Sequence, residues 1–564
     1  MRILGISCYY HDSAAALVVD GHVVANVEEE RLSRAKHDSG FPSQAVRYCL
    51  AQAGLTARDL DGVAFYEKPL TKFHRLAQTA RQYPPADVAE WADKLARLRH
   101  ESLEVDATFR HEFGYSGPFW FVEHHASHGA SAFFCSPFER AAIVTLDGVG
   151  EFATTTIGRG HGRLCEILAE IDYPHSLGLF YGAITAFLGF AVNSDEYKVM
   201  GLASYGKPSY LDQMNRLLQV RDDGSFELDL KYFAFHRDEN RMFSDALVQL
   251  LGAPHASGAA AGQREMDIAA SAQAKLEEAF LAILRQAHRL TGESNLCLAG
   301  GVALNGVANW RSFRASPFEE LFIQPAAGDA GGAIGAALYA YHQQVGAGPR
   351  HVGAFSPYLG PAYSDGEIEG ALTSFGLPYR KLSECELLSD VAERIAGDQI
   401  VGWFQGRMEV GPRALGARSI LGNPANPDMK GHINACVKFR EEFRPFAPAV
   451  LEERAEEFFA LDGRATPYML LVPQAQPGAA QRIPAVVHID NTARVQTVSR
   501  DTNPRFHDLL SELDRRTGIP VVLNTSFNVK GEPIVCSPTD AVRCFLNTDI
   551  DALAIGNYLV EKAF

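Results

Sequence analysis

The sequence lacks the marks of several large classes of protein. None of its apolar runs is long enough to span a bilayer, and residues 1–7 enter a strand pattern at once, without a signal-peptide layout. The nine cysteines are scattered with no Cys-x-x-Cys pair, which argues against a disulfide framework and against a cysteine-bound zinc. The net charge of −16 argues against a broad surface for DNA or RNA. We therefore expect a cytoplasmic protein with reduced thiols, no membrane contact and no nucleic-acid partner.

The composition is otherwise that of an ordinary globular protein. Hydrophobic residues make up 47% and charged residues 21% of the 564 positions. This length predicts two or more domains. Whether the chain forms a homo-oligomer is left open by the sequence.

One plan of three β-strands occurs twice in the first half. Strands are expected over residues 2–7, 14–19 and 22–27, and again over 141–146, 153–157 and 164–168. Asp20-Gly21 lies between two apolar runs, which is a strong signal for a hairpin turn. The repetition predicts an internally duplicated α/β domain, with chance similarity of two such segments as the alternative.

Two histidines four residues apart are the clearest chemical feature. His124 and His128 lie in a segment rich in small residues that is expected to be helical, so both imidazoles would share one face. The strand over 141–146 would deliver Asp147 at its carboxyl end. Two imidazoles and a carboxylate without a thiolate suit iron, manganese or zinc. The alternative is that the histidines form hydrogen bonds in a core.

Two glycine-rich loops follow a long alanine-rich helix expected over residues 267–290. The loops cover residues 298–305 and 324–332, and the second runs into a small-residue helix over 333–341. Glycines at such junctions let the backbone approach a ligand, and a helix N-terminus favours an anion. Residues 345–353 have the composition of a linker.

Basic side chains gather in three short stretches of the second half. Residues 406–419, 437–448 and 523–533 place arginines and lysines among glycines, prolines and polar turns. In an acidic chain this grouping favours a pocket for a phosphate-bearing small molecule. The alternative is a set of salt bridges to Glu409, Glu441 and Glu442.

Ten stretches spread over the chain resemble one known family. They are His11-Asp-Ser-Ala-Ala, Glu28-Glu-Glu-Arg31, His124-His-Ala-Ser-His128, Leu146-Asp-Gly148, Tyr197 to Tyr205, Gly300 to Asn305, Gly328-Asp329, Gly406 to Ser419, Lys438 to Pro445 and Asn524-Thr-Ser-Phe-Asn528. The chain resembles the O-carbamoyltransferases that tailor natural products, of the nodulation-factor and tobramycin type. The motifs keep their order nearly end to end, which is far more specific than any one of them.

The resemblance implies two domains. Residues 1–345 would form a duplicated actin-like ATPase (ASKHA, ribonuclease H-like) domain that transfers the carbamoyl group at a metal. Residues 354–564 would form a YrdC-like α/β domain, with the option that its last strand returns to the first domain. In the family the second domain makes carbamoyl-adenylate from carbamoyl phosphate and ATP, with Mg as the usual companion of ATP. The first domain then moves the carbamoyl group to a hydroxyl of a small molecule, as in antibiotic biosynthesis.

The resemblance also implies the site residues. The metal, commonly Fe(II) with other divalent ions left open, would be held by His124, His128, Asp147 and Asp329. His11 and Lys198 would be the catalytic candidates. Contacts to carbamoyl phosphate and adenylate would come from Arg413, Arg418, Ser419, Lys438, Arg444, Arg494, Asn524 and Ser526. The nucleotide loops of the first domain would use Gly300, Gly301, Asn305 and Gly328.

Three other functions compete with this one. A tRNA threonylcarbamoyl-transferring enzyme would share the chemistry, but the charge of −16 speaks against RNA. An actin-like sugar kinase would explain the hairpin repeat and the glycine loops, but not the His-x-x-x-His site or the arginine cluster. A non-catalytic nucleotide-binding protein would leave the polar residues among the glycines without a role.

Overall fold

The computed structural model describes residues 1–238, 240–438, 440–441 and 443–562. These residues divide into two compact units. The first unit comprises Met1–Glu29 and His37–Phe355, and the second comprises Glu30–Lys36 and Ser356–Phe564. In this part of the chain, no helix combines the length and the apolar character that crossing a bilayer requires.

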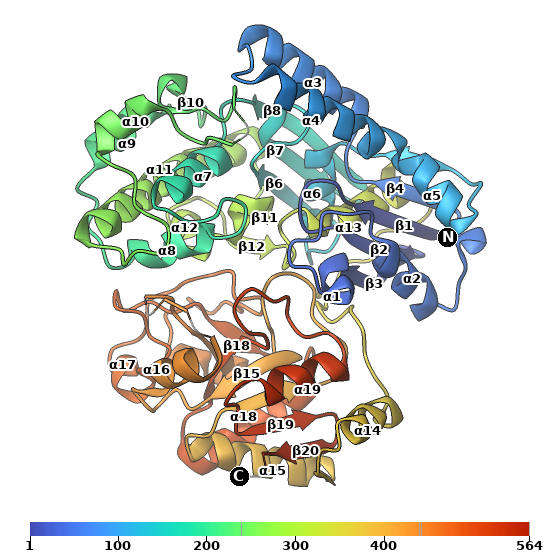
Figure 1. Ribbon diagram of the computed structural model, residues 1–564, viewed down its shortest axis with the longest axis vertical. Helices are drawn as coiled ribbons and strands as arrows, with labels where there is room; N and C mark the ends of the chain where they lie inside the picture. The colour runs from blue at the N-terminus through green and yellow to red at the C-terminus, as the bar shows by residue number, and fades with distance from the viewer. Residues whose placement is uncertain (239, 439, 442, 563–564) are drawn as a thin grey trace. The chain divides into compact units, whose positions relative to one another are not determined.

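The first unit contains two five-stranded sheets with the same topology (Figure 1). One has the order β3-β2-β1-β4-β5 and the other β8-β7-β6-β11-β12. In each, three consecutive strands pair antiparallel, and two later strands add in parallel. The strands are β1 (Arg2–Ser7), β2 (Ala14–Val19), β3 (His22–Glu28), β4 (Gly62–Phe65), β5 (Phe119–Phe121), β6 (Arg140–Leu146), β7 (Ala153–His161), β8 (Leu164–Asp172), β11 (Asn295–Ala299) and β12 (Glu320–Ile323). The predicted duplication is therefore confirmed, and with it the actin-like fold class.

Two helices made largely of small residues lie against these sheets. Helix α6 (His124–Phe133) packs on β6 and β11, and α13 (Ala330–Tyr339) packs on β1, β2 and β4. The two helices also contact each other, and a Cβ added at Gly335 would lie 1.7 Å from the carbonyl oxygen of Ser127. Small side chains are thus required where the two backbones meet.

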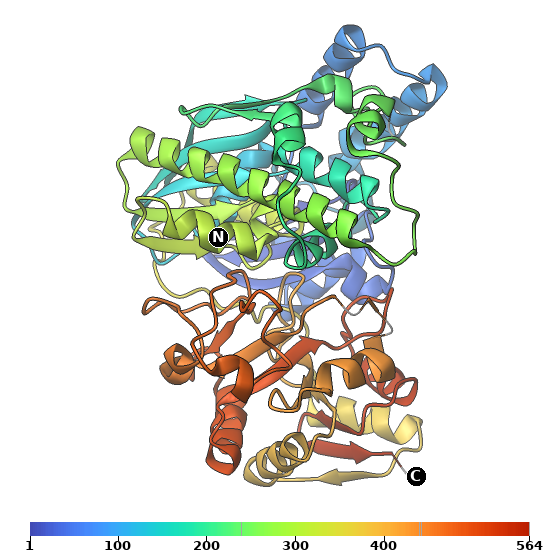
Figure 2. The same cartoon turned by 90° about the vertical axis from the view of Figure 1, so that its left-hand side faces the viewer.

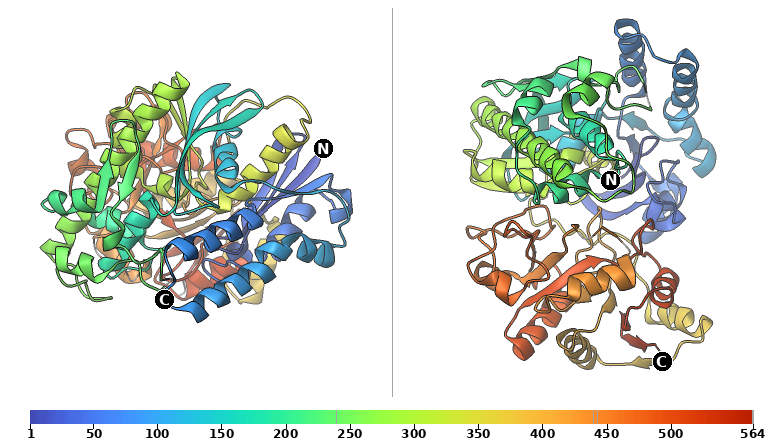
Figure 3. Two further views of the ribbon diagram at one scale, coloured as in Figure 1. Left: turned by 90° about the horizontal axis from the view of Figure 1, so that it is seen from above. Right: turned by 60° about the vertical axis from the view of Figure 1, so that its left-hand side comes forward.

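The remaining helices of the first unit lie outside the sheets. The longest is α11 (Gln263–Thr291), seen along its length in Figure 2, which packs against α8 (Glu196–Ala203) and α12 (Gly306–Arg314). Helices α3 (Pro69–Gln82) and α4 (Val88–His100) lie side by side and stand out from the unit in both views of Figure 3. The others are α2 (Ser43–Gln52), α5 (Val105–Phe113), α7 (Leu177–Phe187), α9 (Leu211–Leu217) and α10 (Asp245–Leu251).

The second unit is built on one mixed sheet of eight strands. Its order is β13-β20-β19-β14-β15-β18-β16-β17. The strands are β13 (Tyr379–Lys381), β14 (Val401–Phe404), β15 (Arg418–Gly422), β16 (Ala447–Leu451), β17 (Gln496–Val498), β18 (Val521–Ser526), β19 (Ala552–Ile555) and β20 (Tyr558–Glu561). Strand β20 pairs with β19 and β13, so the last strand remains in the second unit and does not return to the first.

Alternate residues of the central strands enter two separate cores. Trp403 and Leu421 face the core that contains α15 (Glu384–Ala396) and α18 (Pro504–Thr517), while Phe404 and Ile420 face the opposite core. This second core includes side chains of α14 (Asp365–Ser374) and α19 (Pro538–Leu546). The period of two along each strand therefore places helices on both faces of the sheet.

A short segment from the N-terminal part of the chain belongs to the second unit. In residues 30–36, Arg31 donates a hydrogen bond to the carbonyl of Gly411 at 3.0 Å, and Arg34 donates to the carbonyl of Ile534 at 2.6 Å. Leu32 packs against an apolar cluster that includes Met408 and Ile534. The second unit is therefore built from two separate stretches of sequence.

Candidate functional site

The two predicted histidines lie on one buried helix. All ten residues of α6 are buried, and the Nε2 atoms of His124 and His128 lie 3.1 Å apart. Spacing by four residues places both rings on one face. The predicted helix and the shared orientation of the imidazoles are both observed.

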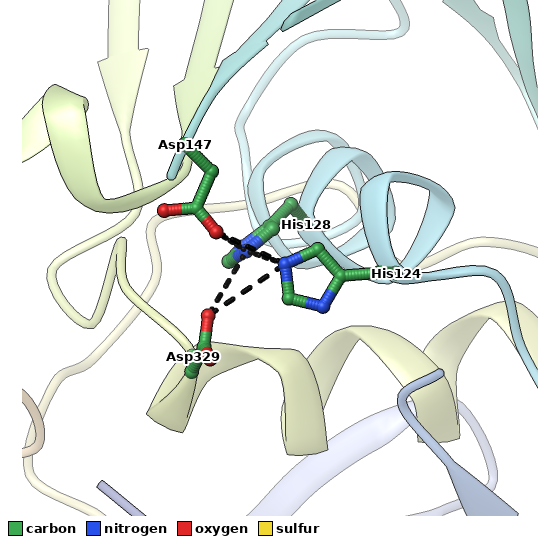
Figure 4. A group of neighbouring side chains, drawn as sticks. All are labelled: His124, His128, Asp147 and Asp329. Atoms are coloured by element: carbon green, nitrogen blue, oxygen red, sulfur yellow. Dashed lines mark hydrogen bonds and ion pairs between the residues drawn. The ribbon is translucent and has the colours of Figure 1, made fainter. Parts of the chain in front are cut away.

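Two aspartates from distant parts of the sequence complete the group (Figure 4). Asp147 directly follows β6, and its Oδ2 lies 3.0 Å from His124 Nε2 and 3.4 Å from His128 Nε2. Asp329 directly precedes α13, and its Oδ1 lies 3.7 and 3.5 Å from the same two nitrogens. One ligand atom from each of the four residues lies within 4.8 Å of the others.

The properties of this group fit a divalent cation. Both carboxylate oxygens of Asp329 are buried without a hydrogen-bond partner among the described residues, and its side chain is 1% exposed. Burial opposes the charged form of His128, but the carboxylates of Asp147 and Asp329 outweigh it and raise the imidazole pKa to about 9. Two buried acids that draw charge onto an imidazole provide the negative field that a metal ion needs. The donor set of two nitrogens and two oxygens suits iron, manganese or zinc.

Neighbouring groups fix the orientation of the four side chains. The second oxygen of Asp147 accepts a hydrogen bond from the backbone N–H of Gly301 at 2.9 Å. Both oxygens of Glu151 accept from the backbone N–H of His124 at 3.1 Å. Gly300 has φ +90°, and a Cβ there would lie 2.2 Å from the carbonyl oxygen of Leu146. Glycine is therefore required where the loop passes behind Asp147.

His11 is held in a polar turn of the first unit. Its Nδ1 lies 3.1 Å from Asp12, whose other carboxylate oxygen lies 2.8 Å from His37 Nδ1. Burial lowers the pKa of His11, but Asp329 and Asp12 outweigh this effect and raise it to about 9.

The other predicted residues of the first unit have structural partners. Lys198 forms an ion pair with Asp195 at 2.9 Å, one helical turn earlier, and its ammonium group lies 5.5 Å from the ring of Phe190. Asn305 accepts a hydrogen bond from the N–H of Ala308 at 3.0 Å and so caps α12. Gly328 has open space where a Cβ would lie. These contacts favour a structural ion pair for Lys198 and a capping role for Asn305.

In the second unit, Lys438 and Ser526 come together at the end of β18. Lys438 Nζ donates to the carbonyl and the side-chain oxygen of Asn528, both at 2.9 Å, and lies 3.3 Å from Ser526 Oγ. Burial, with like charges on Arg440 and Arg444 nearby, lowers the pKa of Lys438 well below its ordinary value. Arg444 lies 3.5 Å from Glu441. Its side chain is 17% exposed, against 30% for Glu441. Because the lowered pKa weakens the charge of Lys438, the two arginines supply most of the positive charge of this basic spot in an acidic protein.

Three other residues that were predicted to contact phosphate form hydrogen bonds within the protein. The Arg418 guanidinium is fully buried, donates to the carbonyls of Gln405 and Pro361 at 3.0 and 2.9 Å, and lies 3.6 Å from the ring centre of Phe404. Ser419 accepts from the N–H of Gly416, and Asn524 donates to Gln496. These geometries favour support of the loop over residues 406–417 rather than direct contact with a ligand.

The alternative prediction was that the basic residues form salt bridges to Glu409, Glu441 and Glu442. Among the described residues, it holds only in part. Glu409 accepts hydrogen bonds from the backbone N–H groups of Leu415, Ala417 and Arg418, so it holds the loop rather than an arginine fork. Glu441 lies beside Arg444, whereas Glu442 lies outside the described residues. Arg413 and Arg494 belong to the same unit, and each has an interaction partner.

Sequence reasoning missed several supporting residues. Glu151 accepts from the backbone of His124, Ser176 donates to the backbone carbonyl of Asp147, and Asn528 accepts from Lys438; Gly301 was predicted as a nucleotide-loop residue but holds the Asp147 carboxylate. Glu151 lies four residues after Asp147, and Asn528 lies within a motif already recognised. No periodicity marks such residues, because their role depends on contacts between distant segments.

Comparison with known proteins identifies the family of the chain. Residues 2–338 match the domain family described as Carbamoyltransferase N-terminus, and residues 392–562 match Carbamoyltransferase C-terminus. The chain therefore belongs to the carbamoyltransferase family and is a transferase that acts on the carbamoyl group.

Relatives resemble the chain over most of its length. An uncharacterized protein of Synechocystis sp. is 46% identical over 100% of this chain and 97% of its own. Nodulation protein NolNO of Sinorhizobium fredii is 40% identical over 98% of this chain and 79% of its own, and nodulation protein U of Rhizobium tropici is 31% identical over 94% and 91%. The expected family is thus confirmed.

Among solved structures, the likeness is limited to part of the fold. Component A of (R)-2-hydroxyglutaryl-CoA dehydratase from Acidaminococcus fermentans covers 61% of this chain and 99% of its own, with 16% identity and a TM-score of 0.35. HypF of T. kodakarensis covers 61% of this chain and 48% of its own, with 15% identity and a TM-score of 0.32.

Proposed function

We propose that this transferase is an ATP-dependent O-carbamoyltransferase that works in two steps. In the first step, carbamoyl phosphate and ATP would react in the second unit, which we take to be YrdC-like, to give carbamoyl-adenylate, pyrophosphate and phosphate. In the second step, the carbamoyl group would pass to a hydroxyl of a small natural product or sugar at the four-residue group of the first unit. One observation supports the proposal: a chain of the carbamoyltransferase family contains a buried group of two imidazoles and two carboxylates.

His124, His128, Asp147 and Asp329 would hold the metal, with Fe(II) as our first choice. When bound, it would supply Lewis-acid stabilisation of the negative charge that develops as the hydroxyl attacks. The buried walls of the group would exclude water from a reactive carbamoyl donor. Glu151 and Gly301 would keep the ligands in place through the hydrogen bonds described above.

His11 would be the group that accepts the proton of the acceptor hydroxyl. Its Nδ1 contact with Asp12 leaves Nε2 as the atom to take that proton. With a pKa of about 9 in the metal-free protein, the ring is protonated at neutral pH, and charge neutralisation of Asp329 by a cation would lower this value. The neutral ring required of a base would then become available.

The positive spot of the second unit would bind the phosphates. Lys438 and Arg444 would contact carbamoyl phosphate and the adenylate, together with Ser526 and, less directly, Arg413 and Arg494. Burial makes each charge at this spot stronger toward an anion than it would be in water. ATP would bind together with Mg. Both substrates are small, so a local basic spot is enough to bind them, and the net charge of −16 is compatible with such a spot. The nine free thiols fit a cytoplasmic setting.

Pyrophosphate release tests the first step. Purified protein is incubated with ATP, Mg and Fe(II), with or without carbamoyl phosphate, and no acceptor is added. We expect pyrophosphate only when carbamoyl phosphate is present. Transfer of the γ-phosphate from ATP to a sugar, without any carbamoyl-phosphate dependence, would instead favour the kinase.

Two variants separate the steps. His128→Ala is expected to keep pyrophosphate release and to lose carbamoylation of the acceptor, whereas Arg444→Ala is expected to lose pyrophosphate release and still use pre-made carbamoyl-adenylate. His161→Ala and Arg500→Ala, at the exposed end of β7 and on the surface of the second unit, are the matched controls. Equal loss of both activities in each variant would contradict two separate sites.

A further inference from the structure

A small cavity in the first unit lies beneath the projecting helices α3 and α4. Its volume is about 50 Å³, and its walls come from these two helices, from Tyr173 and from the loop over residues 235–238. A single water needs about 10–15 Å³ measured in this way, so the space suits a group of roughly four non-hydrogen atoms. Ring side chains of Tyr83, Trp91, Tyr173 and Phe235 line much of the wall.

One cation in this wall has a buried N–H group without a hydrogen-bond partner among the described residues. Arg75, on α3, is 6% exposed, and its guanidinium lies 4.9 Å from the ring centre of Tyr173. Its Nε–H has no hydrogen-bond partner among the residues that the structure describes. An arginine remains charged in proteins, and a buried charge without hydrogen bonds is costly. A bound anion would remove that cost.

The other charged groups around the cavity are already engaged. Asp87 accepts hydrogen bonds from the first N–H groups of α4, and Glu90 accepts one from Asn240. Arg237 donates to the carbonyl of Pro84 at 3.1 Å. The neighbouring Glu67 pairs with Lys72 at 2.7 Å. These partners leave the Arg75 guanidinium as the group suited to recognise a ligand.

The walls of the cavity are attached to the metal-site loop. Glu151, which accepts from His124 N–H, also accepts from Lys68 N–H at 2.6 Å, immediately before α3 begins. The ring of His74 lies 5.7 Å from that of Phe152, whose carbonyl accepts from Tyr173 N–H at 2.8 Å. A molecule bound beside Arg75 would thus lie against the same segment that positions the ligand His124.

We propose that this cavity binds a carboxylate group of the acceptor, so that the natural acceptor is an acidic hydroxyl compound such as a sugar acid. This inference rests on the proposed O-carbamoyl transfer and adds the chemical class of its substrate. The planar guanidinium matches a carboxylate through two parallel hydrogen bonds. The cavity has room for the carboxylate and the carbon that carries it, and its aromatic walls would contact that carbon.

The test compares two probes that differ only at C6, which is a carboxylate in one and a hydroxymethyl group in the other. Binding of methyl β-glucuronide and of methyl β-glucoside is measured by calorimetry on the whole protein with Fe(II). We expect the glucuronide to bind about tenfold or more tightly than the glucoside, the range that charge-assisted hydrogen bonds provide. Arg75→Met should remove this preference, whereas Arg81→Met, on an exposed position of the same helix, should keep it.

A second variant and a separate activity assay complete the test. Ala80→Met fills the cavity while keeping Arg75, and it should also weaken glucuronide binding; this variant decides the matter if Arg75→Met does not fold. Pyrophosphate release on the same preparations tests the proposed function independently of any acceptor. Equal binding of the two probes, no glucuronide binding at millimolar concentration, or an unchanged preference in Arg75→Met would each overturn the inference. A methyl glucoside 6-phosphate that binds more tightly than the glucuronide would overturn the assignment to a carboxylate.

Discussion

Replacing Asp329 with Asn should uncouple the stability of the first unit from metal ions. Both oxygens of this buried carboxylate lack a hydrogen-bond partner in the described residues, and the His128 imidazole at 3.5 Å balances its charge only in part, so a cation adds stability that the metal-free protein lacks. Asn keeps the shape and removes the charge. We therefore expect the metal-free variant to lose only the attraction to His128, and to respond far less to added metal.

The size of the effect follows from the linkage between binding and unfolding. A ligand at 100 times its Kd stabilises a protein by about 2.7 kcal/mol. The first unit has roughly 350 residues, and about 2.1 cal/mol/K per residue gives an unfolding entropy near 0.7 kcal/mol/K. The Tm of the parent should thus rise by about 4 °C. If Asn weakens binding about 100-fold, the same metal concentration gives less than about 1 °C.

Differential scanning calorimetry with and without Fe(II), Mn(II) or Zn(II) provides the measurement. Asp267→Asn is the matched control, because that aspartate lies on α11 and accepts hydrogen bonds from Lys207 and Gln263. Loss of those hydrogen bonds should lower the Tm of this variant with and without metal alike, so the metal-induced rise should be unchanged. A full 4 °C rise in Asp329→Asn, or none in the parent with any of the three metals, would refute the reasoning.

Three further predictions concern stability. Gly300→Ala should cost about 1–3 kcal/mol and weaken metal binding, because φ +90° and the 2.2 Å approach to the Leu146 carbonyl exclude a Cβ; denaturant titration and metal titration measure the two effects. Arg418→Met should lower the stability of the second unit by about 3 kcal/mol in denaturant titration, because several buried carbonyls lose their donor. Burial, with Arg350 nearby, lowers the pKa of His342 to about 4 from 6.5, so the unfolded state binds more protons between these values and stability decreases as the pH falls from 6.5 to 4. Urea titrations from pH 7 to pH 4 should lose about 3 kcal/mol from this group, and His342→Phe should flatten the profile by that amount; an unchanged profile would contradict the assignment.

Much of the fold could be predicted because it depends on local patterns. The Asp20-Gly21 turn between alternating apolar runs specifies β2 and β3, and the same arrangement recurs around Asp147. The spacing of His124 and His128 fixes their common face as soon as the segment is helical. Local sequence therefore determined the hairpins, the helix and one half of the four-residue group.

The rest depends on contacts between distant segments. Asp329 reaches the histidines only because α13 packs on α6, and no local pattern encodes that packing. Arg418 has the same sequence context as a phosphate-binding arginine, yet its position inside β15 buries it against Phe404. The unpaired Arg75 has no motif at all, since its burial results from the covering of α3 by α4 and Tyr173.

The origin of residues 30–36 has a consequence for attempts to dissect the protein. Cutting the chain before Ser356 would give a C-terminal fragment without Leu32 over Met408 and without the hydrogen bonds from Arg31 and Arg34. The fragment would expose an apolar patch and leave backbone carbonyls in need of donors. A self-sufficient second unit would therefore have to carry residues 30–36 as an added peptide, and no cut at a single peptide bond separates the two units.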